Sequence, residues 1–394
     1  MAAAMFDTWP GKIYVAPGAS DELCDILKGM GKSRVMFITD TGLKDFDWVK
    51  NMVQKLRDGG FEVAFFGEIG PNPVTGLVEA ARDVMLELKP DVIVALGGGS
   101  PIDAAKAANV IYTYGGGVKD YGAGGPGSKK IGPGMLTLVA IPTTAGTGSE
   151  VSQISVITDA EAQIKFGLMS NSIVPDVVIL DANLTLTLPK SMTAFTGIDA
   201  LTHCIEAYVS TVDFAPGKAL ALHGIRMIKD ALPRAYADGS DLKAREEMLM
   251  ASFLGGMSFS TCMLGACHAC AHVLSAVYNT PHGLANAVLL PEIMKVNKPA
   301  CASRLADIAQ AMGGDVRGLS EDRAADLAIE LVADLCARVG IPKYLDDIGV
   351  KREDLDMLAG KAIMDGCIFT NPVPGTLELV TRIYTELFRD PAAR

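Results

Sequence analysis

The 394-residue sequence contains few features of secreted, membrane-spanning or nucleic-acid-binding proteins. Its eight cysteines show no framework spacing, which favours a reducing cytoplasm over secretion. The N-terminus lacks a basic segment followed by an apolar one, so we expect no export signal. No uninterrupted run of about eighteen apolar residues occurs, so we expect no membrane span. The net charge of −11, without any Lys/Arg cluster, argues against nucleic acid as a partner.

Histidine is also scarce, with five in the whole chain. Three of them, His268, His272 and His282, stand close together, and a fourth, His203, lies upstream. From Met248 to Pro291 the chain has no Asp, Glu, Lys or Arg. We therefore expect this stretch to be core helix, apolar on nearly all sides, with its histidines buried.

The order of the expected elements indicates two domains, because the chain is too long for one compact core. Strands are expected at 34–40, 62–69, 91–100 and 137–144, and a last strand pattern ends within 175–189, with helices at 47–60 and 76–90. Such alternation predicts a parallel sheet covered by helices on both faces, a Rossmann-like nucleotide-binding fold. From Ser191 onward nearly everything is helical. We expect an NAD-binding α/β domain at 1–186 and an all-α, metal-binding and catalytic domain at 187–394.

A glycine-rich turn connects the strand at 91–97 to the helix that follows it. Ser100 suits the N-cap, Pro101 the first helical position, and Asp103 a capping box. Backbone N–H groups at Gly97–Gly99 and the helix N-terminus would suit a pyrophosphate. The spacing is not that of the Rossmann fingerprint, and an ordinary tight turn explains it equally well.

Two further polar positions follow strands. The hydroxyls of Thr143, Thr144 and Thr147 suit phosphate, ribose or amide contacts, although a capped helix start would explain them alone. Asp40, at the end of its strand, could accept hydrogen bonds from a ribose and repel a 2′-phosphate, which favours NAD over NADP. A turn-forming aspartate is the equal alternative.

The spacing of the histidines suggests a metal site. Asp199 and His203 are four residues apart, as are His268 and His272, so each pair shares a helix face. His282 follows a proline in a loop that can fold back. Three imidazoles and one carboxylate would suit Fe(II) or Zn(II). A buried Asp199 without a Lys or Arg partner would cost several kcal/mol, and a dication would supply the missing counter-charge.

The alternative for each of these residues is a structural role. A single buried histidine is more often a satisfied core residue than a ligand, and His223, which shows no partner, is assigned to that class. Cys267 and Cys270 form a C-x-x-C pair, for which core cysteines are favoured over a redox or zinc site because no second pair exists.

Four motifs, GGGSPIDAAK, IPTTAGTGSEVS, TGIDALTHCIEAYVS and HACAHVLSAVYNTPHGLANAVLLP, occur together. In their order and spacing the chain resembles the iron-containing (group III) alcohol dehydrogenases of the dehydroquinate synthase-like superfamily, nearly end to end. The resemblance implies metal ligation by Asp199, His203, His268 and His282. It places His272 beside the nicotinamide as a proton-relay or orienting residue. It implies cofactor contacts at Asp40, Asn72, Gly98, Gly99, Ser100, Thr143, Thr144, Thr147 and Lys165, and a substrate pocket with Ile154, Phe259 and Cys367.

The expected function is therefore reversible hydride transfer between NAD(H) and a small primary alcohol or aldehyde, with Fe(II) as the expected metal and Zn(II) as the alternative. A glycerol dehydrogenase-like zinc enzyme, a dehydroquinate synthase-like lyase and a non-catalytic binding protein are the competing hypotheses. The lyase needs several basic residues, and 248–291 has none. The segments HVLS, FSTC and TNPVP differ from the sequences usual in that family, so the resemblance does not assign the substrate. The resemblance also implies a homodimer or larger homo-oligomer.

Overall fold

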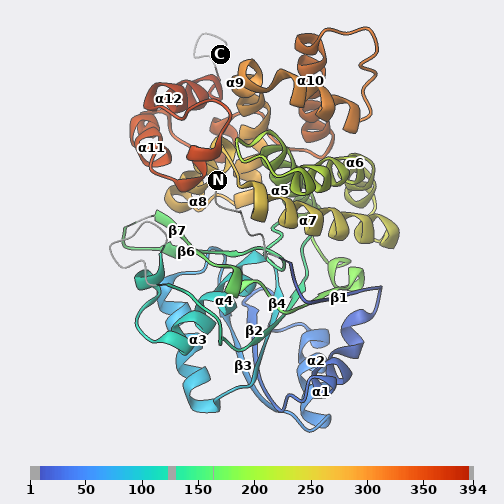
Figure 1. Ribbon diagram of the computed structural model, residues 1–394, viewed down its shortest axis with the longest axis vertical. Coiled ribbons are helices and arrows are strands. Elements are labelled where there is room, and N and C mark those ends of the chain that lie inside the picture. Colours follow the sequence, from blue (N-terminus) through green and yellow to red (C-terminus); the bar gives the residue numbers. More distant parts are fainter. Residues whose placement is uncertain (1–8, 123–129, 163, 390–394) are drawn as a thin grey trace. The chain divides into compact units, whose positions relative to one another are not determined.

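A computed structural model describes residues 9–122, 130–162 and 164–389 (Figure 1). The chain divides into two compact units, 1–186 and 187–394. The first contains every described strand, and the second contains helices only among its described elements. The expected fold class, a parallel α/β part followed by an all-α part, is confirmed.

The first unit is built on a six-stranded parallel sheet of order β1-β8-β5-β4-β2-β3. Its strands are β1 Lys12–Val15, β2 Arg34–Asp40, β3 Glu62–Ile69, β4 Val92–Gly97, β5 Thr137–Pro142 and β8 Val177–Leu180. A separate antiparallel pair is formed by β6 Ile154–Asp159 and β7 Ile164–Met169. The sequence prediction missed β1, β6 and β7. β1 is an edge strand with little burial, and five of the six residues of β7 are at least partly exposed, so neither carries a continuous buried apolar run.

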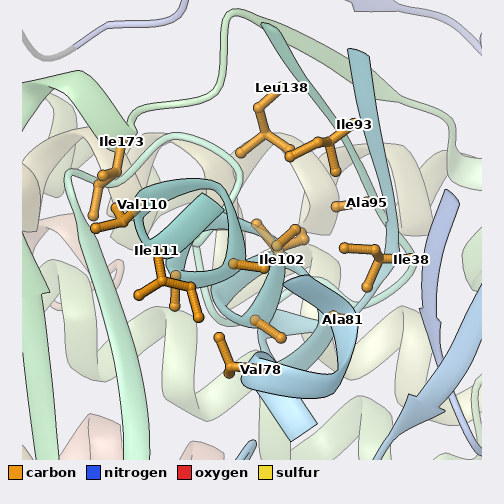
Figure 2. Close-up of a cluster of buried hydrophobic side chains, with 14 of the residues drawn as sticks. Ile38, Val78, Ala81, Ile93, Ala95, Ile102, Val110, Ile111, Leu138 and Ile173 are labelled. Carbon is orange, nitrogen blue, oxygen red and sulfur yellow. The ribbon is translucent and has the colours of Figure 1, made fainter. Parts of the chain in front are cut away.

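Helices cover both faces of this sheet because alternate strand residues point to opposite sides. Val35 and Phe37 pack with α1 Leu23–Gly29 and α2 Asp47–Asp58. Met36 and Ile38 face α3 Thr75–Leu88 and α4 Gly99–Tyr114. Figure 2 shows this second cluster, in which side chains of α3 and α4 meet those of the strands. The buried strands thus hold the carboxyl-end loops on a rigid base.

The start of α4 differs from the sequence prediction. The helix begins at Gly99 with Gly98 as N-cap, so Ser100 is not the cap and Pro101 is not the first helical residue. Gly97 adopts φ 140°, and a Cβ there would lie 2.5 Å from Cγ of Pro101 and 2.8 Å from Oδ2 of Asp40. The backbone conformation of Gly97 thus turns the chain into α4 one residue before the position at which Ser100 could cap it.

Asp103 does not form the expected capping box either. Its Oδ2 accepts the N–H of Val156 at 3.0 Å, and its Oδ1 accepts the hydroxyl of Ser149. The carboxylate therefore ties α4 to the segment that follows β5 rather than to its own first turn.

The second unit consists of packed helices. They are α5 Lys190–Val209, α6 Ala215–Ala237, α7 Leu242–Cys262, α8 Ala266–Tyr278, α9 His282–Ala311, α10 Glu321–Arg338, α11 Leu355–Ala362 and α12 Leu377–Glu386. No single helix in the described part of the chain is long and apolar enough to cross a bilayer, although α7 and α8, bent by 108°, pass that test as a pair.

The charge-free stretch is helical as expected, but it is divided among three helices. Left-handed backbone at Met263 and Asn279 ends α7 and α8 respectively. The prediction that all its histidines are buried was wrong in part. The His268 side chain is 1% exposed, but the side chains of His272 and His282 are 13% and 26% exposed.

A buried cluster of charged side chains lies beside β6. Lys106 is 1% exposed, and its Nζ donates to the carbonyls of Ser152 at 2.8 Å and Ile154 at 2.9 Å. Burial lowers the pKa of Lys106 to about 8. Glu150 is also 1% exposed, and neither carboxylate oxygen has a hydrogen-bond partner among the described residues. Burial raises its pKa to about 7.

We expect Glu150→Gln to stabilise the protein at pH 8 but not at pH 4. The Glu150 carboxyl has a higher pKa in the folded protein than in the unfolded chain. The free energy of unfolding therefore falls as the pH rises from the unfolded pKa of 4.5 toward about 7. The difference between these pKa values corresponds to about 3 kcal/mol in the free energy of unfolding. This is an upper limit, because the substitution also removes the attraction between ionised Glu150 and Lys106. Urea unfolding at both pH values measures it, with exposed Glu161→Gln as the control. An equal effect of Glu150→Gln at both pH values would contradict the assignment.

Candidate functional site

One face of α5 carries three buried polar side chains. Asp199, His203 and Glu206 follow one another at helical spacing and are 2%, 4% and 2% exposed. The N-terminus of α9 lies against the same helix at Gly283, where a Cβ would overlap the backbone carbonyl of Phe195. This close approach brings His282, the first residue of α9, next to Asp199.

Three of the predicted metal ligands converge on one point. Oδ1 of Asp199 lies 3.9 Å from Nε2 of His268 and 3.7 Å from Nε2 of His282. The ligand atoms of these three residues all lie within 4.8 Å of one another. Two ligands about 2.1 Å from a tetrahedral ion would be about 3.4 Å apart, so the three atoms fit one divalent metal after a small contraction.

His203 stands beside this three-residue group. Its ring stacks on the ring of His268 with 4.6 Å between centroids. It also stacks on the ring of Phe259, again with 4.6 Å between centroids. The fourth predicted ligand therefore belongs to the same cluster of rings, while the tightest set of ligand atoms comprises the other three.

Glu206, which sequence reasoning missed, fixes the orientation of His268. Its Oε2 lies 2.5 Å from Nδ1 of His268, and its Oε1 accepts the N–H of Cys267 at 2.7 Å. A proton on Nδ1 donated to this carboxylate leaves the lone pair of Nε2 directed at the site. The spacing of seven residues from Asp199, two helical turns, was the signal that could have identified Glu206.

Glu206→Gln is therefore expected to weaken metal binding without abolishing it. Removing a carboxylate that orients a ligating histidine costs roughly 10- to 100-fold in metal affinity. Titration of Zn(II) against a chromophoric chelator measures the change. A Glu206→Gln protein that binds zinc as tightly as wild type would show that the carboxylate does not tune His268.

Asp365 is a second residue that sequence reasoning missed. Its Oδ2 lies 2.8 Å from Nδ1 of His272, and its Oδ1 accepts the N–H of Cys367 at 2.9 Å. The His272 ring stacks on that of His282 with 5.2 Å between centroids. The predicted proton-transfer residue thus stands next to the metal-ligand cluster, held by a carboxylate from a distant part of the chain. No local spacing in the sequence predicts the contact between His272 and Asp365, which are 93 positions apart.

The predicted cofactor residues of the first unit gather at the carboxyl ends of neighbouring strands. β2 and β4 lie side by side, while β3 and β5 flank them on opposite sides, so the chain reverses direction of winding between β2 and β4. Such a switch point is where open α/β sheets bind ligands. Asp40 ends β2, and Gly98 and Gly99 follow β4. Thr143 follows β5, and its N–H donates to the carbonyl of Gly97 at 2.9 Å.

The glycine turn and the threonine loop face each other. A Cβ at Gly98 would lie 3.3 Å from Oγ1 of Thr144, and one at Gly99 would lie 3.0 Å from Cγ2 of Thr147. The hydroxyl of Thr144 is buried and has no hydrogen-bond partner among the described residues. A buried hydroxyl of this kind, beside glycines that admit close approach, fits a polar ligand such as a dinucleotide.

The remaining predicted residues have mixed positions. Oδ1 of Asp40 accepts the N–H groups of Gly42 and Leu43, so the aspartate does form a turn, and burial raises its pKa. Asn72 lies after β3 with φ 56°.

Lys165 is on β7, and Ser100 is the second residue of α4. Of the predicted pocket residues, Phe259 and Cys367 lie by the histidine cluster, whereas Ile154 belongs to the first unit.

Comparison with known proteins agrees with this arrangement. Residues 10–182 match the family model described as iron-containing alcohol dehydrogenase, and residues 193–388 match its C-terminal counterpart. The 1,3-propanediol dehydrogenase of Citrobacter freundii is 39% identical over 98% of this chain and 100% of its own. The NAD-dependent methanol dehydrogenase of Bacillus methanolicus is 35% identical over 95% and 97%.

A solved structure shares the fold over nearly its full length. The alcohol dehydrogenase from Oenococcus oeni superimposes with a TM-score of 0.94 at 33% identity, covering 98% of this chain and 100% of that one. Full-length similarity at this level, together with both halves of the family model, establishes the relationship. The chain belongs to the iron-containing alcohol dehydrogenase family.

Proposed function

We propose that this protein interconverts a small primary alcohol and its aldehyde, with NAD(H) as hydride carrier and one divalent metal ion. The reaction class follows from the family, since its relatives are named as alcohol dehydrogenases and aldehyde reductases. The observation that supports the metal most is the convergence of Asp199, His268 and His282 on one point, where the stretch 248–291 offers no Lys or Arg as a counter-charge.

Asp199, His203, His268 and His282 would hold the ion. Three imidazoles and one carboxylate suit both Fe(II) and Zn(II), and Fe(II) is the expected ion because of the family. Such an ion, when bound, supplies Lewis acidity toward an alcohol or carbonyl oxygen. The chain's own part is to hold these side chains in place: Glu206 fixes the tautomer of His268, and stacked rings fix His203.

His272 is the proposed proton-transfer residue. Its Nδ1 faces Asp365, which leaves Nε2 to exchange a proton with substrate, cofactor hydroxyl or water. Asp365 is then a positioning residue that sets the ring orientation and tautomer. Cys367 and Phe259, beside the same rings, are proposed to bound the substrate pocket.

The first unit is proposed to bind NAD(H), which supplies the hydride or accepts it. The backbone at Gly98, Gly99 and Ser100 would approach the pyrophosphate, and the hydroxyls of Thr143, Thr144 and Thr147 would contact polar groups of the cofactor. Asn72 and Lys165 remain proposed contacts from the family pattern. A cytoplasmic, homo-oligomeric protein is also proposed, and the eight free cysteines fit a reducing compartment.

Asp40→Ser tests the coenzyme preference. A carboxylate beside the ribose position repels a 2′-phosphate, so its removal should raise kcat/KM for NADPH roughly tenfold while lowering that for NADH. Initial rates with both coenzymes and a common aldehyde measure the ratio. Asp45→Ser, an exposed aspartate in the same loop, is the control. An unchanged ratio in Asp40→Ser would leave Asp40 only its turn-forming role.

The function itself is tested on the wild-type protein. Purified anaerobically and supplied with Fe(II) or Zn(II), it should oxidise NADH in the presence of short aldehydes, which absorbance follows. Absence of turnover with any aldehyde under both metals would contradict the proposed reaction.

A further inference from the structure

A hairpin outside the main sheet carries one of the proposed coenzyme contacts. Strands β6 and β7 form a two-stranded sheet of their own, in which Lys165 of β7 pairs with Thr158 of β6. A two-stranded hairpin is only marginally stable by itself, so its position depends on an anchor elsewhere in the fold. The N–H of Thr158 donates to the carbonyl of Pro73 at 2.8 Å. This end of the hairpin therefore touches the segment of Asn72, another proposed contact.

The start of β6 is anchored by a buried lysine of α4. Nζ of Lys106 donates to the carbonyls of Ser152 at 2.8 Å and Ile154 at 2.9 Å, and it lies 3.1 Å from the hydroxyl of Ser152. Three acceptors thus match the three hydrogens of the ammonium group. An apolar side chain could fill this space at a lower desolvation cost, but it could not hold two carbonyls in place.

Asp103, one turn earlier on α4, holds the next residues of β6. Its Oδ2 accepts the N–H of Val156 at 3.0 Å, and its backbone carbonyl accepts the hydroxyl of Ser155 at 2.8 Å. Its Oδ1 accepts the hydroxyl of Ser149, which belongs to the threonine loop. Because Asp103 and Lys106 are three residues apart, they share a helix face, and together they bind the start of β6 to that face.

The same helix begins at the glycine turn, where the pyrophosphate is proposed to bind. Gly98 is the N-cap of α4 and Gly99 its first residue, so Asp103 and Lys106 lie about one and two turns farther along. Burial raises the pKa of Asp103, and the charges of Lys106 and Lys165 act in the opposite direction, so both lysines lie near this carboxylate. One helix therefore connects the glycine turn to the hairpin.

We propose that Asp103 and Lys106 are positioning residues for the coenzyme, which hold the hairpin against α4 so that Lys165 keeps a fixed place relative to the glycine turn. The inference rests on the proposed coenzyme site of the first unit. A lysine side chain is long and has many rotamers, so its ammonium reaches one phosphate or ribose oxygen reliably only when its backbone is fixed. Groups that bind a ligand depend on neighbours that lock them in this way.

Two variants of different severity test the anchor. Lys106→Met removes the ammonium group but keeps the length of the side chain. Ser155→Ala removes only the hydroxyl that donates to Asp103, so it tests the anchor even if Lys106→Met does not fold. Lys218→Met is the matched control, because Lys218 of the second unit is 8% exposed and also donates to a backbone carbonyl, that of Ser210. The metal-loaded proteins are compared in Kd for NADH by fluorescence, in KM, in kcat and in metal content.

We expect Lys106→Met to raise both Kd and KM for NADH about tenfold, because charge-assisted hydrogen bonds are lost. Ser155→Ala should raise them roughly two- to fivefold. In both variants kcat and metal content should stay near those of wild type, and Lys218→Met should bind NADH as wild type does. Unchanged NADH binding in folded Lys106→Met, or in Ser155→Ala if Lys106→Met does not fold, would overturn the inference. Equal weakening in Lys218→Met would overturn it as well.

A double-mutant cycle with Lys165→Met separates positioning from a general loss of stability. If Lys106 acts through Lys165, then Lys165→Met alone weakens NADH binding, and adding Lys106→Met weakens it little further. Effects that multiply in the double variant, or unchanged binding in Lys165→Met, would overturn the inference. Wild-type protein that binds no NADH would overturn the proposed function itself, a distinguishable result.

Discussion

His268→Ala should yield a folded protein that retains little metal and almost no alcohol dehydrogenase activity. The side chain is 1% exposed and directs Nε2 at the carboxylate of Asp199 from 3.9 Å, with Glu206 fixing its tautomer. Its removal takes away one ligand and the imidazole partner of Glu206. Loss of the ion removes several kcal/mol of stabilisation of the reacting oxygen, so we expect kcat/KM to fall on the order of a thousandfold or more.

Metal content by elemental analysis and kcat/KM should fall together in this variant. His223→Ala is the control, because His223 lies exposed on α6 and takes no part in the cluster. Wild-type metal content with wild-type rate in His268→Ala would refute its assignment as a ligand.

His272→Ala has the second largest expected effect, and it should differ in kind. The side chain lies by the rings of His268 and His282 but is paired with Asp365 instead of the carboxylate of Asp199. We therefore expect full metal content and a loss of kcat of roughly a hundredfold to ten-thousandfold, the usual contribution of general acid–base catalysis.

A conservative change at the neighbouring carboxylate sharpens this prediction. Asp365→Asn keeps a hydrogen-bonding side chain beside His272 but changes which tautomer it favours, so its loss of kcat should be smaller than that of His272→Ala. Loss of metal from His272→Ala would instead make His272 a ligand.

The local parts of the site could be predicted from sequence, because helical spacing alone places Asp199 and His203 on one face. The strand ends that carry Asp40 and Gly98 were likewise recognisable from short apolar runs between turn residues. What escaped prediction depends on contacts between distant segments. Glu206 and Asp365 gain their roles from side chains up to 93 positions away.

Local rules also failed where backbone geometry replaced them. Ser100 has the residue type of an N-cap, yet Gly97 at φ 140° completes the turn first, and α4 begins at Gly99. Asp103 has the position of a capping-box acid, yet its partners are Ser149 and Val156. The backbone conformation of Gly97 in the first case, and a tertiary contact in the second, outweighed a preference worth about 1 kcal/mol.

A crystal of the metal-loaded enzyme, with anomalous scattering measured on both sides of the absorption edge of the added ion, would examine the cluster on α5, α8 and α9 directly. We predict a single strong peak within about 2.0–2.3 Å of a carboxylate oxygen of Asp199 and of ring nitrogens of His203, His268 and His282. A peak elsewhere, or one that touches fewer than three of these residues, would contradict the account.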